Sequence, residues 1–402
     1  MELSNFIQEY LADQDEGMKI LLAFFLNSVM LVEAAQQAGA DWYERTGKRM
    51  ARRNGKKKRT LLSRYGRLEL EKPEFRDKPF KTVVFEKYSR IEKSLINAIL
   101  ESYIQGVSTR KIRHIMAKMG IEGVSAETVS NLGKQLDEQV LAFLNRPIEH
   151  PILYLIVDAV YIRVRRKHQY VNLAVLIVAG IRDDGYRELL GVQISDSEGE
   201  GFWLSLFDDL KRRGLRGVQM VISDGHKGIR SAVSKSFVGA SWQMCQVHFL
   251  RAIFNKVPKK RQPEVIQLVK SALNGNEDLL PEVAEKLAQM GFHQAADTVE
   301  AFMYDVGNYR AFPKAHWKRI RTTNMVERVN GEIKRRTKVV AVFPSRESLI
   351  RLAGSILMDI NEEWITGNRY LDMTEFVDKQ ILEAESGLQL SSECQVASIA
   401  DH

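Results

Sequence analysis

The sequence predicts an α/β protein, in which a mixed β-sheet covered by helices follows helical segments. Three observations predict this class. Short runs rich in Ile, Leu and Val recur with turn residues between them over residues 151–194, which is typical of neighbouring strands. A helical pattern over 201–213 leads to an apolar run that ends in Asp224, as expected for a strand that pairs beside the first. From 249 to 317 the pattern is helical, which predicts an inserted all-α module.

The composition favours a protein with a polyanionic partner. The 402 residues provide for about two to four domains. There are 59 Lys and Arg against 51 Asp and Glu, and the positive charges are clustered, which indicates nucleic acid. The two cysteines, Cys245 and Cys394, are far apart and form no disulfide framework, which suits a reducing cytoplasm.

The N-terminal region, 1–44, is predicted to be helical and apolar. Its apolar run over 20–32 is interrupted by Asn27 and Ser28, and we expect it to be too short to span a bilayer. The basic start of a signal peptide is missing. An apolar helix needs a partner, either the rest of the chain or a second copy, so 1–44 is a possible dimerisation region.

A basic stretch and a hairpin are predicted over 45–87. Nine of the fifteen residues from Arg45 to Arg59 are Lys or Arg, a density that a core cannot hold. The stretch is therefore solvated or bound to phosphate, and a flexible charged linker is the alternative. Residues 60–71 alternate around Tyr65 and Gly66, which predicts a small hairpin. The candidate DNA contacts in this stretch are Arg52, Arg53, Lys56, Lys57 and Lys58.

Residues 88–146 have the pattern of a helix-turn-helix domain. Gly106 ends a first helix, Ser108 caps a second that continues to 118, and Ser125 caps a third over 126–143. The second helix is basic, and its candidate DNA contacts are Arg110, Lys111 and Arg113. A structural three-helix bundle is the alternative, because spacing alone does not establish DNA binding.

Two carboxylates end apolar runs in the predicted sheet. Asp158 follows the run 152–157, and Asp224 lies in a Ser-Asp-Gly turn after the run 218–223. A buried carboxylate is costly unless it is paired, and a divalent cation is a common partner. Enzymes that cut phosphodiesters use such pairs to hold two Mg²⁺ ions. A turn-capping Asp at a strand end is the structural alternative.

Glu327 is the candidate for a third carboxylate. Asn324, Glu327 and Asn330 recur every three residues along one stripe of a predicted helix. The same helix is strongly basic further on, so it can carry a metal ligand and contact phosphates. Asn324 and Glu327 also have the spacing of a capping box, in which Glu327 only closes the helix start. Glu332 is the second-choice ligand.

Cys245 and His248 have the spacing of half a zinc site. This indication is weak, because only Cys394 remains and no second pair has the spacing of metal ligands. A buried cysteine at a strand end is an equally good interpretation of Cys245.

Taken together, these motifs resemble the IS256 family of transposases, the bacterial relatives of Mutator elements. The resemblance covers about residues 45–365. Two departures are His226, where a small or apolar residue is expected, and Ala341, where Gly is usual. The motifs that carry the resemblance are Val157-Asp-Ala, Ser223-Asp-Gly, Lys227-Gly, Cys245-Gln-Val-His, Thr322-Thr-Asn-Met-Val-Glu-Arg-Val-Asn-Gly, Arg335-Arg-Thr-Lys-Val-Val, Val342-Phe-Pro and Gln105-Gly-Val-Ser-Thr-Arg.

The resemblance implies an RNase H-like catalytic core in two parts, 147–248 and 321–380, with an α-helical insertion over 249–320. The composition of the last residues predicts a flexible tail over 381–402. It implies a DDE triad at Asp158, Asp224 and Glu327 that holds Mg²⁺, for which Mn²⁺ can substitute. Cys245 and His248 are expected beside the catalytic centre, with His248 on DNA near the cleaved bond. The further DNA contacts expected on the basic helix are Arg328, Asn330, Lys334, Arg335, Arg336 and Lys338.

The expected activity is that of a DNA transposase. It would bind terminal inverted repeats, hydrolyse a phosphodiester and join the 3′-hydroxyl to target DNA, through a copy-out, paste-in route with a circular intermediate. We expect a homodimer at the bacterial nucleoid in the cytoplasm, without a membrane or a nucleotide cofactor. A nuclease of the same fold that lacks strand transfer and a catalytically inactive DNA-binding protein are the alternatives.

Overall fold

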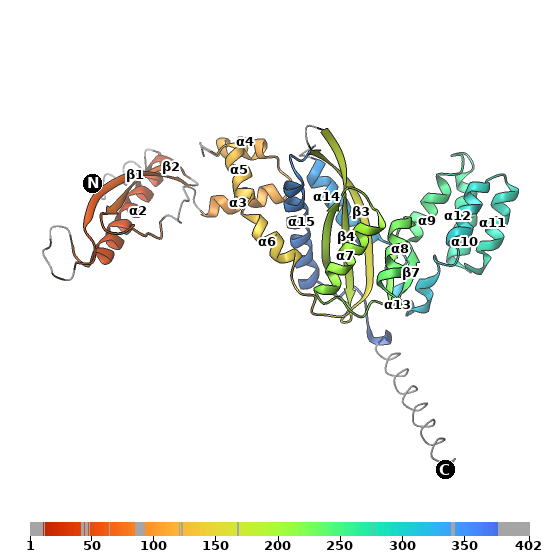
Figure 1. Cartoon of the computed structure of the whole chain (residues 1–402). Coiled ribbons are helices and arrows are strands. Elements are labelled where there is room, and N and C mark those ends of the chain that lie inside the picture. Colours follow the sequence, from red (N-terminus) through yellow and green to blue (C-terminus); the bar gives the residue numbers. More distant parts are fainter. Residues whose placement is uncertain are drawn as a thin grey trace, which may run out of the picture. The chain divides into compact units, whose positions relative to one another are not determined.

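A computed structural model of the chain is shown in Figure 1. It describes residues 11–376, apart from 12, 42–43, 45–46, 48, 64, 85–92, 120, 122–123, 167–168, 276 and 339–341. The chain divides into two compact units, Met1–Gln135 and Leu136–His402. The predicted tail over 381–402 and Ala341 lie outside the described residues.

In the first unit, a helix packs on a two-stranded hairpin. Helix α2 (Gln14–Ala38) buries Met30 and Ala34 against Leu68 and Leu70 of the hairpin formed by β1 (Arg53–Ser63) and β2 (Gly66–Phe75). The strands are antiparallel, with Ser63 opposite Gly66, which confirms the predicted hairpin. The basic residues from 53 to 59 belong to β1, so the interpretation of this part as a flexible linker is wrong.

Helix α2 is longer than the apolar run indicates. Ser28 and Asn27 do not interrupt it, because the Ser28 hydroxyl donates to the Phe24 carbonyl and the Asn27 side chain accepts from the Glu71 amide. The segment Glu16–Ala38 is long and apolar enough to cross a membrane by length and composition alone. The prediction that this run is too short was therefore wrong. In this structure one side of α2 covers the hairpin instead.

Three helices follow in the first unit: α3 (Lys93–Ile104), α4 (Thr109–Lys118) and α5 (Ala126–Gly133). The Ser108 and Ser125 side chains accept hydrogen bonds from Lys111 and Thr128 amides, which confirms both predicted caps. Ile99, Ile112 and Val129 are fully buried between the helices.

The third predicted helix, 126–143, is divided in two. Helix α5 ends at Gly133, and α6 (Leu136–Leu144) belongs to the second unit. There Asp137 accepts two hydrogen bonds from Arg351 at 2.6 and 2.8 Å. Val140 packs so closely on Gly354 that a Cβ at 354 would lie 2.3 Å from Val140 Cγ1. These distant contacts set the direction of α6.

The second unit contains a five-stranded mixed sheet in the order β5-β4-β3-β6-β7. Strands β3 (Ile152–Arg166), β4 (Gln169–Arg182) and β5 (Arg187–Ser195) are antiparallel. Strands β6 (Met220–Ser223) and β7 (Ser241–Met244) run parallel to β3. The prediction of a mixed sheet in an α/β fold is confirmed. Strand β3 is continuous from Ile152 to Arg166, although Asp158 follows the apolar run 152–157.

Helices cover both faces of this sheet. Leu155 and Val157 join the core beneath α7 (Glu200–Arg212) and α8 (Lys227–Ser236). Because side chains alternate along a strand, Tyr154, Ile156 and Asp158 belong to the opposite face. On that side α14 (Asn324–Lys338) packs against β3, and α15 (Arg346–Thr366) packs against β5.

A helical module follows β7 in the chain. It comprises α9 (Gln246–Phe254), α10 (Gln262–Asn274), α11 (Leu280–Gln289), α12 (His293–Phe302) and α13 (Lys314–Ile320), with short 3₁₀ turns at Glu277–Leu279 and Asn308–Ala311. Figure 1 shows α10, α11 and α12 as one compact group. Its buried residues are continuous with the core beneath α7 and α8.

Candidate active site

The strand register brings Asp158 and Asp224 together. Ile156 opposite Ile222 is the last pair between β3 and β6. Asp158 lies two residues further along β3, and Asp224 directly follows the end of β6. Continued alternation past Ser223 places Asp224 on the same face of the sheet as Asp158. Asp158 is in the middle of β3 and not at a strand end as predicted. The end of β6, rather than the end of β3, opens the space beside it.

Asp158 is buried and has a strongly perturbed acidity. Its side chain is 8% exposed. One carboxylate oxygen accepts from the Ala159 amide at 2.9 Å and the other from Asn330 Nδ2 at 2.8 Å. The pKa of Asp158 is raised to about 6, mainly by burial; the Ala159 amide and the charge of His248 lower it, whereas the charges of Asp224 and Glu327 raise it. The site therefore concentrates negative charge without full compensation.

Asp224 is held at the start of α8. Its carboxylate accepts from the His226 amide at 3.1 Å, and His226 Nδ1 accepts from the Gly228 amide at 3.3 Å. His226, which departs from the resembled family, therefore caps α8. Gly228 allows close approach of the loop at Glu198, because a Cβ at 228 would lie 2.4 Å from the Glu198 carbonyl.

Glu198 is an acidic neighbour of Asp224 that the sequence analysis missed. Its pKa is raised by burial and by the charge of Asp224, and its side chain is hydrogen-bonded to Tyr161. The only sequence signal is the acidic loop 196–200 after the third strand, which has no fixed spacing from the other carboxylates. It is a fourth carboxylate near the predicted three.

Glu327 faces helix α9. Its carboxylate lies 3.4 Å from His248 Nε2 and 4.0 Å from Arg251 Nη2. Its amide donates to the Thr323 carbonyl, and Asn324 is already the first residue of α14. The capping box between Asn324 and Glu327 is therefore not formed. The negative charge of Glu327 raises the pKa of Asp158, as does that of Asp224, so the three predicted carboxylates interact electrostatically.

Cys245 and His248 form a buried cluster with Thr323. The Thr323 amide and hydroxyl both lie 3.3 Å from Cys245 Sγ. Burial alone would raise the pKa of Cys245, but the hydrogen bond and charge of His248 lower it overall. The hydrogen bond to Cys245 is also the main reason that the pKa of His248 rises to about 9. A protonated His248 thus lies between the thiol and Glu327.

The donor chemistry of the site suits Mg²⁺, although the donors are not assembled into a cage. Within the described ranges, no group of three or more His, Cys, Asp or Glu side chains is placed to hold a metal ion, and this applies also to the zinc half-site. Mg²⁺ takes hard oxygen ligands and needs only one or two carboxylates, with water and phosphate oxygens as the rest. Asp158 and Asp224 offer such oxygens, and the buried Asn330 Oδ1 has no hydrogen-bond partner among the described residues.

The predicted DNA contacts divide into exposed and buried residues. Cys245, Asn330 and Arg336 are at most 7% exposed, which leaves them no surface for DNA. Asn330 holds Asp158, and Arg336 pairs with Asp359 and Glu332. His248 is part-buried against Glu327. Those that are exposed are Arg52, Lys56, Lys57, Lys58, Arg110, Lys111, Arg113, Arg328, Lys334, Arg335 and Lys338, and Arg53 is half-buried.

Comparisons with known proteins agree on one family. The family model described as "Transposase, Mutator family" matches residues 2–367. The chain is 39% identical to the transposase for insertion sequence element IS256 in transposon Tn4001 of Staphylococcus aureus, over 90% of this chain and 94% of that protein. It is 36% identical to the transposase for ISRM5 of Rhizobium meliloti, over 92% and 94%. It is 34% identical to the transposase for IS1081 of Mycobacterium tuberculosis, over 91% of each.

A solved structure, the Drosophila P element transposase strand transfer complex, is similar over 75% of this chain and 87% of that one. The TM-score is 0.30 and the sequence identity is 11%, so this likeness is too small to argue from.

Proposed function

The chain belongs to the Mutator family of transposases, and we propose that it cuts DNA at the ends of an insertion sequence and joins the freed ends to target DNA. We place the catalytic centre at Asp158, Asp224 and Glu327, in a core of RNase H type with the helical module as its insertion. The sheet order and the mixed strand directions support this assignment.

One observation carries the proposal. A buried carboxylate, Asp158, lies beside the end of β6, and the charges of Asp224, which follows β6, and of Glu327, on the basic helix α14, both act on it. The hydrogen bonds from Ala159 and Asn330 compensate the burial of Asp158 only in part, since its raised pKa indicates that the anion is not fully stabilised. A site that receives cations together with phosphate accounts for this arrangement.

Each residue has a role in the proposed reaction. Two bound Mg²⁺ ions would supply activation of the attacking oxygen and stabilisation of the leaving oxygen in an in-line displacement at phosphorus. Asp158, Asp224 and Glu327 would hold them. Asn330 orients Asp158, and His248, backed by Cys245 and Thr323, orients Glu327. Water attacks first and releases a 3′-hydroxyl, which then attacks a target phosphodiester.

The remaining surfaces supply DNA binding in this proposal. The exposed Lys and Arg of β1, α4 and α14 would contact terminal repeats and the DNA near the cut. Two ends must be brought together, so we propose a homodimer in the bacterial cytoplasm, at the nucleoid. A circular intermediate in a copy-out, paste-in route belongs to the same proposal.

Strand transfer distinguishes this function from that of a nuclease. Purified protein, a labelled terminal-repeat duplex with a 3′-hydroxyl end and a supercoiled plasmid are incubated with Mg²⁺ and then with Mn²⁺. Label joined to the plasmid supports a transposase, and cut duplex without joined product supports a nuclease. If the duplex is bound but neither cut nor joined, the protein is a DNA-binding protein without this chemistry.

A further inference from the structure

A cavity lies on the side of α14 away from Glu327. Its volume is about 420 Å³, within the range of small-ligand pockets. Asn324, Arg328 and Glu332 face it at intervals of one helical turn. On the other side of α14, Glu327 contacts His248 and Asn330 contacts Asp158. We call this cavity the basic pocket; its charged and aromatic lining residues are Arg187, Lys318, Arg319, Arg321, Arg328, Glu332, Glu363, Trp364 and Tyr370.

The positive charges of the basic pocket are only partly compensated by the carboxylates that line it. In the part of the chain that the structure describes, none of its five Lys and Arg side chains has a carboxylate within 4.0 Å. Glu332 is engaged by Arg335 at 2.8 Å and by Arg336 at 3.4 Å. Five cations against the two carboxylates Glu332 and Glu363 leave an excess of positive charge, so the cluster is suited to an anion.

Aromatic rings hold two of these arginines in place. The Arg187 guanidinium lies over the rings of Trp364 and Tyr370, 4.5 and 5.0 Å from their centroids. Arg319 lies over Tyr370 at 4.7 Å. Stacking fixes the planes of the guanidinium groups and leaves their N–H edges free for a ligand. Arg187 Nε is buried and has no hydrogen-bond partner among the described residues.

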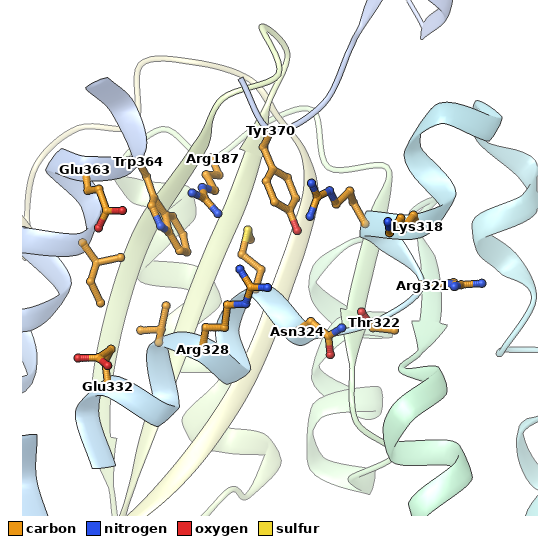
Figure 2. Close-up of a pocket in the computed structure, with 14 residues that line it drawn as sticks. Arg187, Lys318, Arg321, Thr322, Asn324, Arg328, Glu332, Glu363, Trp364 and Tyr370 are labelled. Atoms are coloured by element: carbon orange, nitrogen blue, oxygen red, sulfur yellow. The ribbon is translucent and has the colours of Figure 1, made fainter. Parts of the chain in front are cut away.

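Figure 2 shows the side chains of Arg187, Arg328 and Tyr370 directed toward one space, while Arg321 points away from it. Apolar side chains, Met325, Val329 and Ile360, complete the lining. The cavity therefore offers a planar cationic region beside an apolar wall, and it is larger than a lone phosphate needs.

We propose that the basic pocket binds one nucleotide unit, with its phosphate between Arg187, Arg319 and Arg328. Guanidinium groups bind two phosphate oxygens at once, and the apolar wall accommodates sugar or base. The unit comes either from a DNA strand that passes the start of α14, which rests on the proposed function, or from a free nucleotide. The shared chemistry is a nucleotide phosphate.

The test is binding without catalysis, in EDTA, with the full chain. The probes are a labelled terminal-repeat duplex with a single-stranded extension and a fluorescent nucleoside triphosphate. The variant is Arg319→Gln with Arg328→Gln, both exposed in this structure. The control, Arg212→Gln with Arg261→Gln, removes the same charge from exposed sites elsewhere. Arg187→Lys keeps the charge but loses the planar fork.

If a DNA strand is the source, the variant weakens duplex binding about tenfold, and the slope of log affinity against log salt falls by about 1, as expected for one lost phosphate contact. The control variant leaves the duplex affinity and its salt slope unchanged, apart from the small effect of its lower net charge. Arg187→Lys weakens binding with an unchanged melting temperature. If a free nucleotide is the source, only binding of the triphosphate is lost.

Unchanged affinity for both probes in the folded variant and in Arg187→Lys overturns the proposal. Wild-type protein that binds no DNA at all contradicts the proposed function, whereas loss of triphosphate binding in the variant would still support the pocket. The two proposals can therefore fail separately.

Discussion

Among single residues, Asp158 has the largest expected effect on stability, because keeping its buried carboxylate charged costs free energy. Its pKa of about 6 in the folded chain exceeds the value of 3.8 expected for an exposed Asp. The folded state therefore binds the proton more tightly than the unfolded state does. The stability that protonated Asp158 gives to the folded state is fully present below about pH 4 and is lost as the pH rises through 6.

Asp158→Asn should therefore stabilise the protein at pH 7.5 in EDTA, by on the order of 2–3 kcal/mol in the free energy of unfolding. The gain over wild type should shrink toward zero between pH 6 and pH 4, where wild-type Asp158 becomes neutral. Urea unfolding of both proteins at several pH values measures this difference. A variant that is no more stable than wild type at pH 7.5 would show that the charge of Asp158 does not destabilise the folded state.

Residue patterns predicted the carboxylates but not their neighbours. Asp158 and Asp224 could be found because an apolar run followed by an acid is visible in the sequence. Glu198 and Arg187 could not, because their importance comes from residues far away in the chain, Asp224 and Tyr370. The buried position of Arg336 was missed for the same reason: its partner Asp359 is on another helix.

At the scale of elements, helix α6 shows how tertiary contacts override local pattern. The sequence from 126 to 143 has a continuous helical pattern, yet the chain turns after Gly133. The close contact of Val140 with Gly354 and the pairing of Asp137 with Arg351 fix α6 against α15. Short-range spacing carries no information on such contacts, whereas the caps at Ser108 and Ser125 are local and were predicted.

Gly354→Ala should destabilise the protein by about 1–3 kcal/mol, because the added methyl group overpacks the contact with Val140. Gly331→Ala is the matched control: it is also helical, and its new Cβ meets no atom within 4 Å. The control should be neutral or gain up to about 1 kcal/mol from helix propensity. Equal effects of the two substitutions in urea unfolding would exclude a close α6–α15 contact.

At the scale of the whole molecule, the exposed stripe of α2 bears on assembly. Leu21, Phe25 and Val32 are 41–61% exposed, on the side that does not cover the hairpin. Phe25→Glu should convert a dimer into a monomer in light scattering without lowering the melting temperature of the monomer. Glu16→Gln, near the start of the same helix, is the control. If the wild-type protein is monomeric at all concentrations, both free and with DNA, the proposed homodimer is contradicted.

The class of the fold was predictable because strand and helix periodicities are local. Asp158 and Asp224, 66 residues apart, are brought near each other by the parallel pairing of β3 with β6. The spacing of apolar runs in the sequence does not specify this pairing. The basic pocket draws on β5, α13, α14 and α15, so no stretch of sequence indicates it, although the basic segment 318–321 was a signal that could have been followed.

In the proposed function Glu327 completes the catalytic site, and cleavage of a labelled terminal-repeat duplex in Mg²⁺ shows whether it does. Glu327→Gln should lower the cleavage rate at least about 100-fold, as removal of a metal ligand costs several kcal/mol. DNA binding and melting temperature should persist. Glu332→Gln, the same change five residues further along α14 and on another face of the helix, should retain cleavage. Cleavage that survives Glu327→Gln and is lost in Glu332→Gln would contradict the account and move the site to Glu332.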